Sequence, residues 1–156
     1  METHIKTSQK TSEDYSLRLI NENDITILYD HFREFLSIPN AAINTKKMPP
    51  FSCSRSFVLK YLHVNEHHEY KNWYIIENSN KEILGNCWIS KKFDIAYHVL
   101  KKYQRKGVAT FCIEKIMELN PSRAYNVTIN WNNIPSRKLI EKIGFIPKQV
   151  TYTNES

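Results

Sequence analysis

Residues 95–109, IAYHVLKKYQRKGVA, hold the clearest pattern that could do chemistry. Apolar residues alternate before Lys101 and recur at helical spacing after Gly107, which indicates a strand, a short basic loop and a helix. The N–H groups at such a helix start have no partner within the helix and lie at the positive end of its dipole. The segment is therefore expected to bind an anion, and a phosphate group fits best.

The spacing of Gln104, Gly107 and Ala109, Q-x-x-G-x-A, differs from the dinucleotide-binding and P-loop patterns. It resembles the pyrophosphate loop of the GNAT superfamily, the acyl-CoA-dependent N-acetyltransferases. A second segment, residues 133–145, is similar to the N-x-x-S/A-x-x-L…G-F helix that follows the fifth strand in that superfamily. Residues 94–97, DIAY, and the segment SRKLIEKIGF resemble the RimJ/RimL-like branch most closely.

The resemblance implies that acetyl-CoA is the cosubstrate, and it indicates which residues would hold it. The pantetheine arm would lie along Tyr97, His98 and Val99, between two strands that splay apart, with the Val99 N–H facing the thioester carbonyl. Asn133 would either hydrogen-bond the pantetheine amide or act as a plain helix cap. The pyrophosphate would lie on the loop and helix start, formed by Gln104, Arg105, Lys106, Gly107, Val108, Ala109 and Thr110.

Acetyl transfer needs a base, because an ammonium has no lone pair, and the leaving thiolate benefits from an acid. Many members of the superfamily have a tyrosine at the position of Ile140 and some have a glutamate at the position of Thr128; this chain has neither. Ser136 lies one helical turn before Ile140 and is the candidate acid. His98, whose ordinary pKa suits neutral pH, and Asp94 are the candidate bases, with a water wire as the alternative.

These residues suggest an N-acetyltransferase that acts on a primary amine, either a protein N-terminus or a small molecule, by direct attack in a ternary complex. The missing tyrosine and glutamate support an alternative, a non-catalytic sensor or scaffold that binds acyl-CoA. A small nucleic-acid-binding domain is a third hypothesis. The net charge of +6 allows it, but the chain has no modular RNA-binding signature, so a nucleic-acid partner is not expected.

The charge and the remaining composition narrow the class of protein. Four basic residues, Lys101, Lys102, Arg105 and Lys106, surround the expected pyrophosphate loop, which suits the phosphates of coenzyme A. The chain has 41% hydrophobic residues but no apolar run of the roughly 20 residues that a membrane span needs, and its polar start is unlike a signal peptide. We therefore expect a cytoplasmic protein with no membrane partner.

Cysteine and histidine usage suggests no metal and no disulfide framework. The three cysteines are far apart, and we expect Cys87 and Cys112 to be buried in a strand and a helix as reduced thiols. His63, His67 and His68 are close together in the sequence, but no acidic or thiol residue completes a ligand set. A polar helix end is the simpler interpretation of the histidines.

The length of 156 residues indicates one domain, expected at 15–156 behind a flexible extension at 1–14, and a homodimer is possible in this branch. The resemblance and the patterns together predict an α/β fold (α+β, three-layer). Its sheet would be mixed and mostly antiparallel, with six or seven strands, a central splayed parallel pair and about four helices. The expected strands are 17–19, 73–77, 83–90, 93–99, 125–131 and 145–152, and the expected helices are 24–36, 54–65, 108–119 and 133–143.

Overall fold

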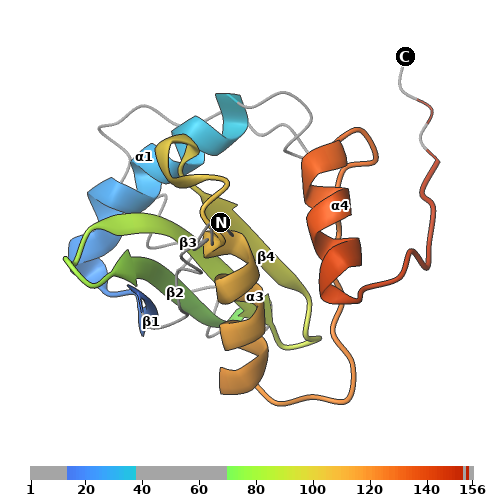
Figure 1. The fold of residues 1–156 in the computed structure, drawn as a ribbon, viewed down its shortest axis with the longest axis horizontal. Coiled ribbons are helices and arrows are strands. Elements are labelled where there is room, and N and C mark those ends of the chain that lie inside the picture. Colours follow the sequence, from blue (N-terminus) through green and yellow to red (C-terminus); the bar gives the residue numbers. More distant parts are fainter. Residues whose placement is uncertain (1–13, 38–69, 153, 155–156) are drawn as a thin grey trace, which may run out of the picture.

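The computed structural model describes residues 14–37, 70–152 and 154 (Figure 1). The expected extension before Asp14, the expected helix at 54–65 and the histidine cluster lie outside these ranges. The described strands are β1 (Tyr15–Leu19), β2 (Tyr70–Asn78), β3 (Ile83–Ser90) and β4 (Ile95–Val99). The α-helices are α1 (Ile25–Ser37), α3 (Val108–Leu119) and α4 (Ile134–Ile143), and the short 3-10 helices are η2 (Glu22–Asp24) and η4 (Lys101–Tyr103).

The four strands form one antiparallel sheet in the order β1-β2-β3-β4, as the alternating patterns of the sequence predict. The β2 and β3 strands are joined by a tight turn and pair Trp73 with Trp88, while β3 pairs with β4 so that Asn86 lies opposite His98. Because β4 is the last strand of the described sheet, one of its edges faces away from β3. That edge borders the candidate site.

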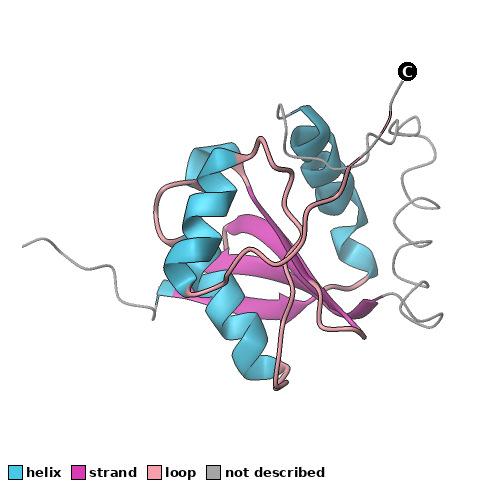
Figure 2. Cartoon of the chain, turned by 90° about the vertical axis from the view of Figure 1, so that its right-hand side faces the viewer, coloured by secondary structure: helices cyan, strands magenta, loops and turns pink. Residues whose placement is uncertain are grey.

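Helices cover both faces of the sheet (Figure 2). The α1 face is packed by Leu28 together with Trp73 and Ile75, which point to the same side of β2. On the opposite face, α3 buries Val108, Cys112 and Ile116 against the sheet. Alternate residues of β2 therefore pack into two hydrophobic cores, one on each face of the sheet. A sheet with helices on both faces is an α/β architecture. None of the described helices is long and apolar enough to cross a bilayer.

An ion-pair network ties the start of α1 to β1 and β2. Arg18 donates to Asp24 at 2.8 Å and to Glu77 at 2.6 Å, and the Asp24 carboxylate also accepts the Asn21 N–H as part of a capping box. Burial opposes ionisation of Asp24, but the Arg18 hydrogen bonds and the Asn21 N–H outweigh it and lower the pKa of Asp24. The network fixes α1 on the sheet, and α1 supplies part of the site.

The expected strand at 125–131 does not form as a continuous strand. Asn126 makes a single parallel bridge with Asp94, through hydrogen bonds to Phe93 and Ile95, and the following backbone leaves the sheet. Trp131, expected in the core, is 62% exposed and stacks under the Arg137 guanidinium at 3.8 Å. Alternation predicts a strand only where a partner edge continues, and here β4 and this segment separate after one bridge.

The expected final strand at 145–152 is also not formed, and the segment runs as irregular chain past α4 (Figure 1). Beyond the half-buried Phe145 its apolar residues are exposed, with Ile146 at 77% and Tyr152 at 92%, so no apolar surface of the described residues buries them. Within the described ranges the chain thus has four of the six expected strands and three of the four expected helices, and the other expected helix, at 54–65, lies outside those ranges. The antiparallel character of the sheet and the α/β class agree with the prediction.

Gly85 lies where β3 and β4 approach closely, as its position inside a strand predicts. A Cβ added at Gly85 would lie 2.1 Å from the His98 carbonyl oxygen, which is backbone and cannot rotate away. The β2–β3 register is also irregular beside it, between Ile76 and Glu77. The glycine therefore sets the path of β4.

We expect Gly85→Ala to destabilise the protein by about 2–3 kcal/mol, because the strands must move apart to accept the methyl group. Urea unfolding measures this loss. Gly144→Ala is the matched control: Gly144 has a positive φ of 113° but nothing within 4 Å of its Cβ, so only about 1–2 kcal/mol of backbone strain is expected. A Gly85→Ala loss no larger than that of the control would contradict the close approach.

Cys87 and Cys112 are buried and unpaired by disulfides, as predicted. They meet between β3 and α3, where burial and the neighbouring Cys112 thiol raise the pKa of Cys87. Both thiols therefore act as small apolar side chains of the core.

Candidate active site at the edge of strand β4

The loop after β4 opens helix α3 in the way that anion-binding helices do. Gly107 is the N-cap with φ 77° and ψ 6°, no side chain caps the helix, and the first helical bond runs from the Phe111 N–H to the Gly107 carbonyl at 3.0 Å. The N–H groups of Val108, Ala109 and Thr110 precede that bond. They form a concave set of donors at the positive end of the helix dipole.

Gly107 has open space around the position that a Cβ would occupy. A Cβ added there would have nothing within 4 Å, so the glycine is not required by packing inside the described chain. Its positive φ is a conformation that glycine adopts without strain, and Arg105 with φ 60° shares it two residues earlier. The loop is thus shaped by two left-handed residues, and it is open at the Cβ position of Gly107.

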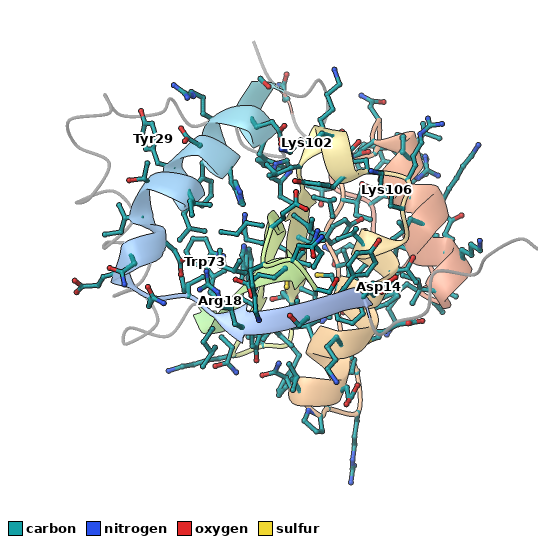
Figure 3. The ribbon with its side chains drawn as sticks, turned by 60° about the vertical axis from the view of Figure 1, so that its left-hand side comes forward. Asp14, Arg18, Tyr29, Trp73, Lys102 and Lys106 are labelled. Carbon is teal, nitrogen blue, oxygen red and sulfur yellow. The ribbon has the colours of Figure 1, made fainter. Side chains whose placement is uncertain are left out.

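The basic residues predicted around this loop do surround it. Lys102 and Lys106 project on the same side of the molecule, with their ammonium groups 4.8 Å and 5.8 Å from the centre of the Tyr103 ring (Figure 3). Lys101, Arg105 and Lys106 are all exposed. The Tyr103 hydroxyl donates to Glu82 at 3.0 Å, so the ring under the two lysines is anchored to the β2–β3 turn.

Gln104 joins the loop to β4. Its side-chain amide donates to the Val99 carbonyl at 3.1 Å. Gln104 is predicted to bind the cofactor, and the structure places its side chain on the strand end. In this position it holds the loop in place and covers one carbonyl of the open strand edge.

The backbone of β4 presents unused donors along its open edge. Leu100 donates to Leu84 of β3 at 2.8 Å, whereas Ile95 donates in the other direction, to Asn126 at 2.8 Å. Because hydrogen-bonding direction alternates along a strand, the N–H groups of Tyr97 and Val99 share the direction of Ile95. Among the described residues, the cross-gap backbone bonds stop at Ile95, so the edge at Tyr97 and Val99 is open.

The Tyr97 hydroxyl is a second unused group at this gap. It is buried and has no hydrogen-bond partner among the described residues. Burial raises the pKa of Tyr97, while the neighbouring Ser136 hydroxyl opposes that rise. Tyr97 of β4 and Ser136 of α4 therefore face each other across the gap, close enough to interact but without a formed hydrogen bond.

Helix α4 brings Ser136 to this place. The Asn133 side chain accepts the Ser136 N–H at 3.4 Å, and the next residues Ile134 and Pro135 begin the helix. The cap role weighed for Asn133 is the one that the structure shows, although its amide N–H groups are still available to donate. Ile140, one turn after Ser136, is buried, so Ser136 lies on the inward face of α4 as its spacing predicts.

His98 points to the opposite face of the sheet, toward α1. Its Nε2 lies 2.8 Å from Glu34 Oε2, and its ring packs edge-on against Phe35 and His31 at centroid distances of 5.5 Å and 6.2 Å. Burial lowers the pKa of His98, and the Glu34 carboxylate raises it by less. His98 is therefore neutral near pH 7, which a base requires.

A buried polar chain continues from this point into the core. The Trp73 Nε1–H donates to Asn86 Oδ1 at 3.0 Å, and Asn86 Nδ2 lies 2.9 Å from His31 Nδ1. Since an indole only donates, the Asn86 oxygen accepts, its amide N–H donates, and His31 must carry its proton on Nε2. Burial lowers the pKa of His31 to about 4.

Beside this chain is an open cavity of about 520 Å³ between α1 and the sheet. Asp30, His31 and Glu34 line it from α1, opposite Ile83 and Leu100. Glu34 thus contacts His98 and also borders the cavity.

Asp94 is separated from the other candidate base. It lies before β4, where its carboxylate accepts the Ser90 hydroxyl at 3.2 Å and its N–H donates to the same hydroxyl at 3.1 Å. His98 is four residues further on, at the opposite end of the strand, roughly 13 Å away at about 3.3 Å per residue. The structure therefore brings Tyr97 and Ser136 together on one face of β4 and places His98 on the other face. Asp94 is near neither group and closes the β3–β4 turn.

Comparison with known protein families identifies the family of this chain. A family model described as the acetyltransferase (GNAT) domain matches residues 16–146. The chain belongs to this family. No curated protein is similar enough in sequence to count as a match.

Solved GNAT structures share the fold at low identity. The RimL ribosomal L7/L12 α-N-protein acetyltransferase in complex with coenzyme A is 15% identical with a TM-score of 0.67, over 85% of this chain and 80% of that one. The spermidine N-acetyltransferase of Vibrio cholerae, in complex with coenzyme A and spermine, is 14% identical with a TM-score of 0.67, over 89% and 84%. The ribosomal-protein-S5-alanine acetyltransferase of Vibrio fischeri is 17% identical with a TM-score of 0.63, over 86% and 80%.

The residues at the gap fit the coenzyme A that this family implies. Open N–H groups at the start of α3 suit a pyrophosphate, exposed lysines suit its charge, and the open edge of β4 suits an amide-bearing arm. The buried Tyr97 hydroxyl without a partner marks a polar position at the same gap. Within the described ranges, no group of histidine, cysteine, aspartate and glutamate is arranged to hold a metal ion.

Glu34, His31 and Asn86 are the residues that sequence reasoning missed. Glu34 and His31 lie on α1 at seven and four positions after Ile27, the spacing of one helix face, and that spacing was the available signal. Asn86 is a polar residue in an apolar strand. Asn86 contacts His31, and Glu34 contacts His98. The two partners are far apart in the sequence in each case, so no local pattern predicts these contacts.

Proposed function

We propose that the chain is an acetyl-CoA-dependent N-acetyltransferase that acetylates a primary amine by direct attack in a ternary complex. The observation that carries the proposal is the open edge of β4, where unused backbone donors at Tyr97 and Val99 lie between two faces of different chemistry. The α3 start and Ser136 lie on one face, and His98 lies on the other. An acyl donor and an amine could therefore approach the same edge from opposite sides.

Acetyl-CoA supplies the acetyl group as a thioester. In our proposal the start of α3 from Gly107 to Thr110 holds the pyrophosphate, with Arg105 and Lys106 adding charge, and Val99 N–H orients the carbonyl. Asn133 donates its free amide N–H to the pantetheine arm while its oxygen caps α4. Ser136 gives a proton to the leaving sulfur, and His98 removes one from the amine. Asp94 is the weaker candidate base because its carboxylate is engaged by Ser90.

The acceptor is proposed only as a class, a protein N-terminus or a small amine. The structural neighbours are named as acetyltransferases of a ribosomal protein and of spermidine, and both kinds of acceptor carry primary amines. A non-catalytic acyl-CoA binder is the second candidate, since Ile140 and Thr128 replace the usual tyrosine and glutamate.

The test is release of free thiol from acetyl-CoA by the purified protein with small amines, polyamines, aminoglycosides and N-terminal peptides in turn. We expect release with one class, and a drop in kcat of roughly 10- to 100-fold in Ser136→Ala with little change in KM for acetyl-CoA. Ser122→Ala, which removes a hydroxyl from the turn after α3, is the control and should keep the wild-type rate.

Two results would argue against the proposal. No release with any class, combined with a higher melting temperature in acetyl-CoA, would favour the non-catalytic binder. A wild-type kcat in Ser136→Ala would leave the proposed transferase activity standing but show that Ser136 is not its acid.

A further inference from the structure

The His98–Glu34 contact joins β4 to α1 at the inner end of the open cavity. His98 Nε2 is 2.8 Å from Glu34 Oε2, and the Glu34 oxygens also lie 3.2 Å and 3.4 Å from the backbone N of Lys101. The His98 side chain is 10% exposed and that of Glu34 is 31% exposed. The Glu34 carboxylate therefore contacts both the His98 ring and the backbone just after β4, and it is still partly exposed to solvent.

We propose that Glu34 is a positioning residue that holds His98 in the Nε2-protonated tautomer, so that the bare Nδ1 takes the proton of the amine acceptor. The inference rests on the proposed acetyl transfer. An ionised carboxylate only accepts hydrogen bonds, so the neutral His98 ring must donate through Nε2. Its lone pair is then on Nδ1, the nitrogen that Glu34 does not contact.

Packing fixes the ring as well as its tautomer. Phe35 and His31 of α1 make edge-on contacts with the His98 ring, and Asn86 lies opposite His98 on β3. Among the described residues, Glu34 and His31 are the titratable side chains that face the ring. Burial lowers the pKa of His31 and keeps this ring neutral near pH 7, so among the described residues Glu34 is the charge that acts on His98.

The proton balance of the step is simple. The N–H bond of the acceptor ammonium breaks, a bond from the proton to His98 Nδ1 forms, and the nitrogen lone pair becomes available for attack on the acetyl carbon. The resulting imidazolium is stabilised by the Glu34 carboxylate at Nε2. Because Glu34 borders the cavity, the proton can leave through that side to solvent.

The tautomer is measurable in the free protein, without acetyl-CoA or turnover. Nitrogen-15 NMR of the His98 ring should show a protonated Nε2 and a bare Nδ1 in the wild type. Glu34→Ala should lose this preference, while Glu34→Gln, whose amide oxygen can still accept, should keep it. Asp30→Asn is the matched control, because Asp30 lies one turn earlier on α1 and pairs with Arg33 instead.

Kinetics with the same variants give the second readout. We expect kcat to fall roughly 10- to 100-fold in Glu34→Ala with KM for acetyl-CoA unchanged, and to be largely restored in Glu34→Gln. The acid limb of kcat/KM should move to lower pH in Glu34→Gln, because the lost charge no longer raises the pKa of His98. Asp30→Asn should keep the wild-type tautomer and rate.

A protonated Nδ1 in the wild type, or an unchanged tautomer and kcat in Glu34→Ala with a wild-type melting temperature, would overturn the proposal. Failure of acetyl transfer is distinguishable from failure of this inference. If the wild type acetylates no amine, the proposed activity fails, whereas the NMR result still decides whether Glu34 holds the ring.

Discussion

Gly107→Glu is expected to abolish coenzyme A binding and to leave the protein folded. The new side chain would begin at the N-cap of α3, where a Cβ has open space around it, next to the first N–H groups of the helix at residues 108–110. There it would occupy and repel the position of a pyrophosphate. We expect the Kd for coenzyme A to rise at least 100-fold, which corresponds to about 2.7 kcal/mol.

Stability should change little in this variant. The positive φ of Gly107 costs a side chain about 1–2 kcal/mol, but a carboxylate at a helix N-terminus recovers about 0.3–1 kcal/mol from the dipole. Calorimetric titration with coenzyme A measures the affinity, and thermal unfolding without ligand checks the fold.

Gly144→Glu is the matched control for this experiment. Gly144 also has a positive φ, of 113°, and open space around its Cβ, but it caps the far end of α4. The control carries the same charge and the same kind of strain away from the α3 start, so it should bind coenzyme A as the wild type does. Equal affinity in Gly107→Glu and wild type would remove the proposed cofactor site.

Acid should destabilise the protein through His31 well before its carboxylates titrate. Burial lowers the folded-state pKa of His31 to about 4, while His98 lowers it and Glu34 raises it by smaller amounts. In the unfolded chain His31 has its ordinary pKa of 6.5, so between pH 6.5 and 4 it binds a proton there but not in the folded chain. Stability is complete above pH 6.5 and falls as the pH drops toward 4, by on the order of 3 kcal/mol.

Urea unfolding of wild type and His31→Gln at pH 7 and pH 4.5 measures this effect. The variant loses stability at pH 7 because the Asn86 amide loses its ring partner, but its further loss between the two pH values should be smaller than that of the wild type by roughly 2–3 kcal/mol. Asp24 and the other carboxylates are present in both proteins and cancel in the difference. Parallel losses in the two proteins would show that His31 is protonated in the fold without penalty.

Local patterns sufficed for much of the fold and for the position of the loop and helix start that we propose hold the cofactor. The alternation before Val99 and the helical spacing after Gly107 place β4, the loop and α3 correctly within a residue or two. Gly85 was expected at a close approach and lies at one. These features depend on neighbours in sequence, since strand and helix periods and a positive φ are properties of short segments.

Patterns failed where a segment needs a distant partner. Residues 125–131 and 145–152 alternate as strands do, yet the first bridges β4 once and the second has its apolar side chains exposed. Asp94 shares the face of His98 by parity, but its carboxylate is engaged at the β3–β4 turn. Strand propensity alone does not show which sheet edge a segment will pair with, because that depends on how the sheet assembles.

The sequence by itself determined the family, the position of the helix start that we propose binds phosphate, and the likeness of Ser136 and Asn133 to the family helix. Only the tertiary structure decided what stands beside His98, because Glu34 is separated from it by 64 positions and by a helix that the Arg18 network locks onto the sheet. It also decided that Tyr97 faces Ser136 with an unused hydroxyl. Hydrogen bonds are short and directional, so such contacts exist only once packing has brought the two elements within about 3 Å of each other.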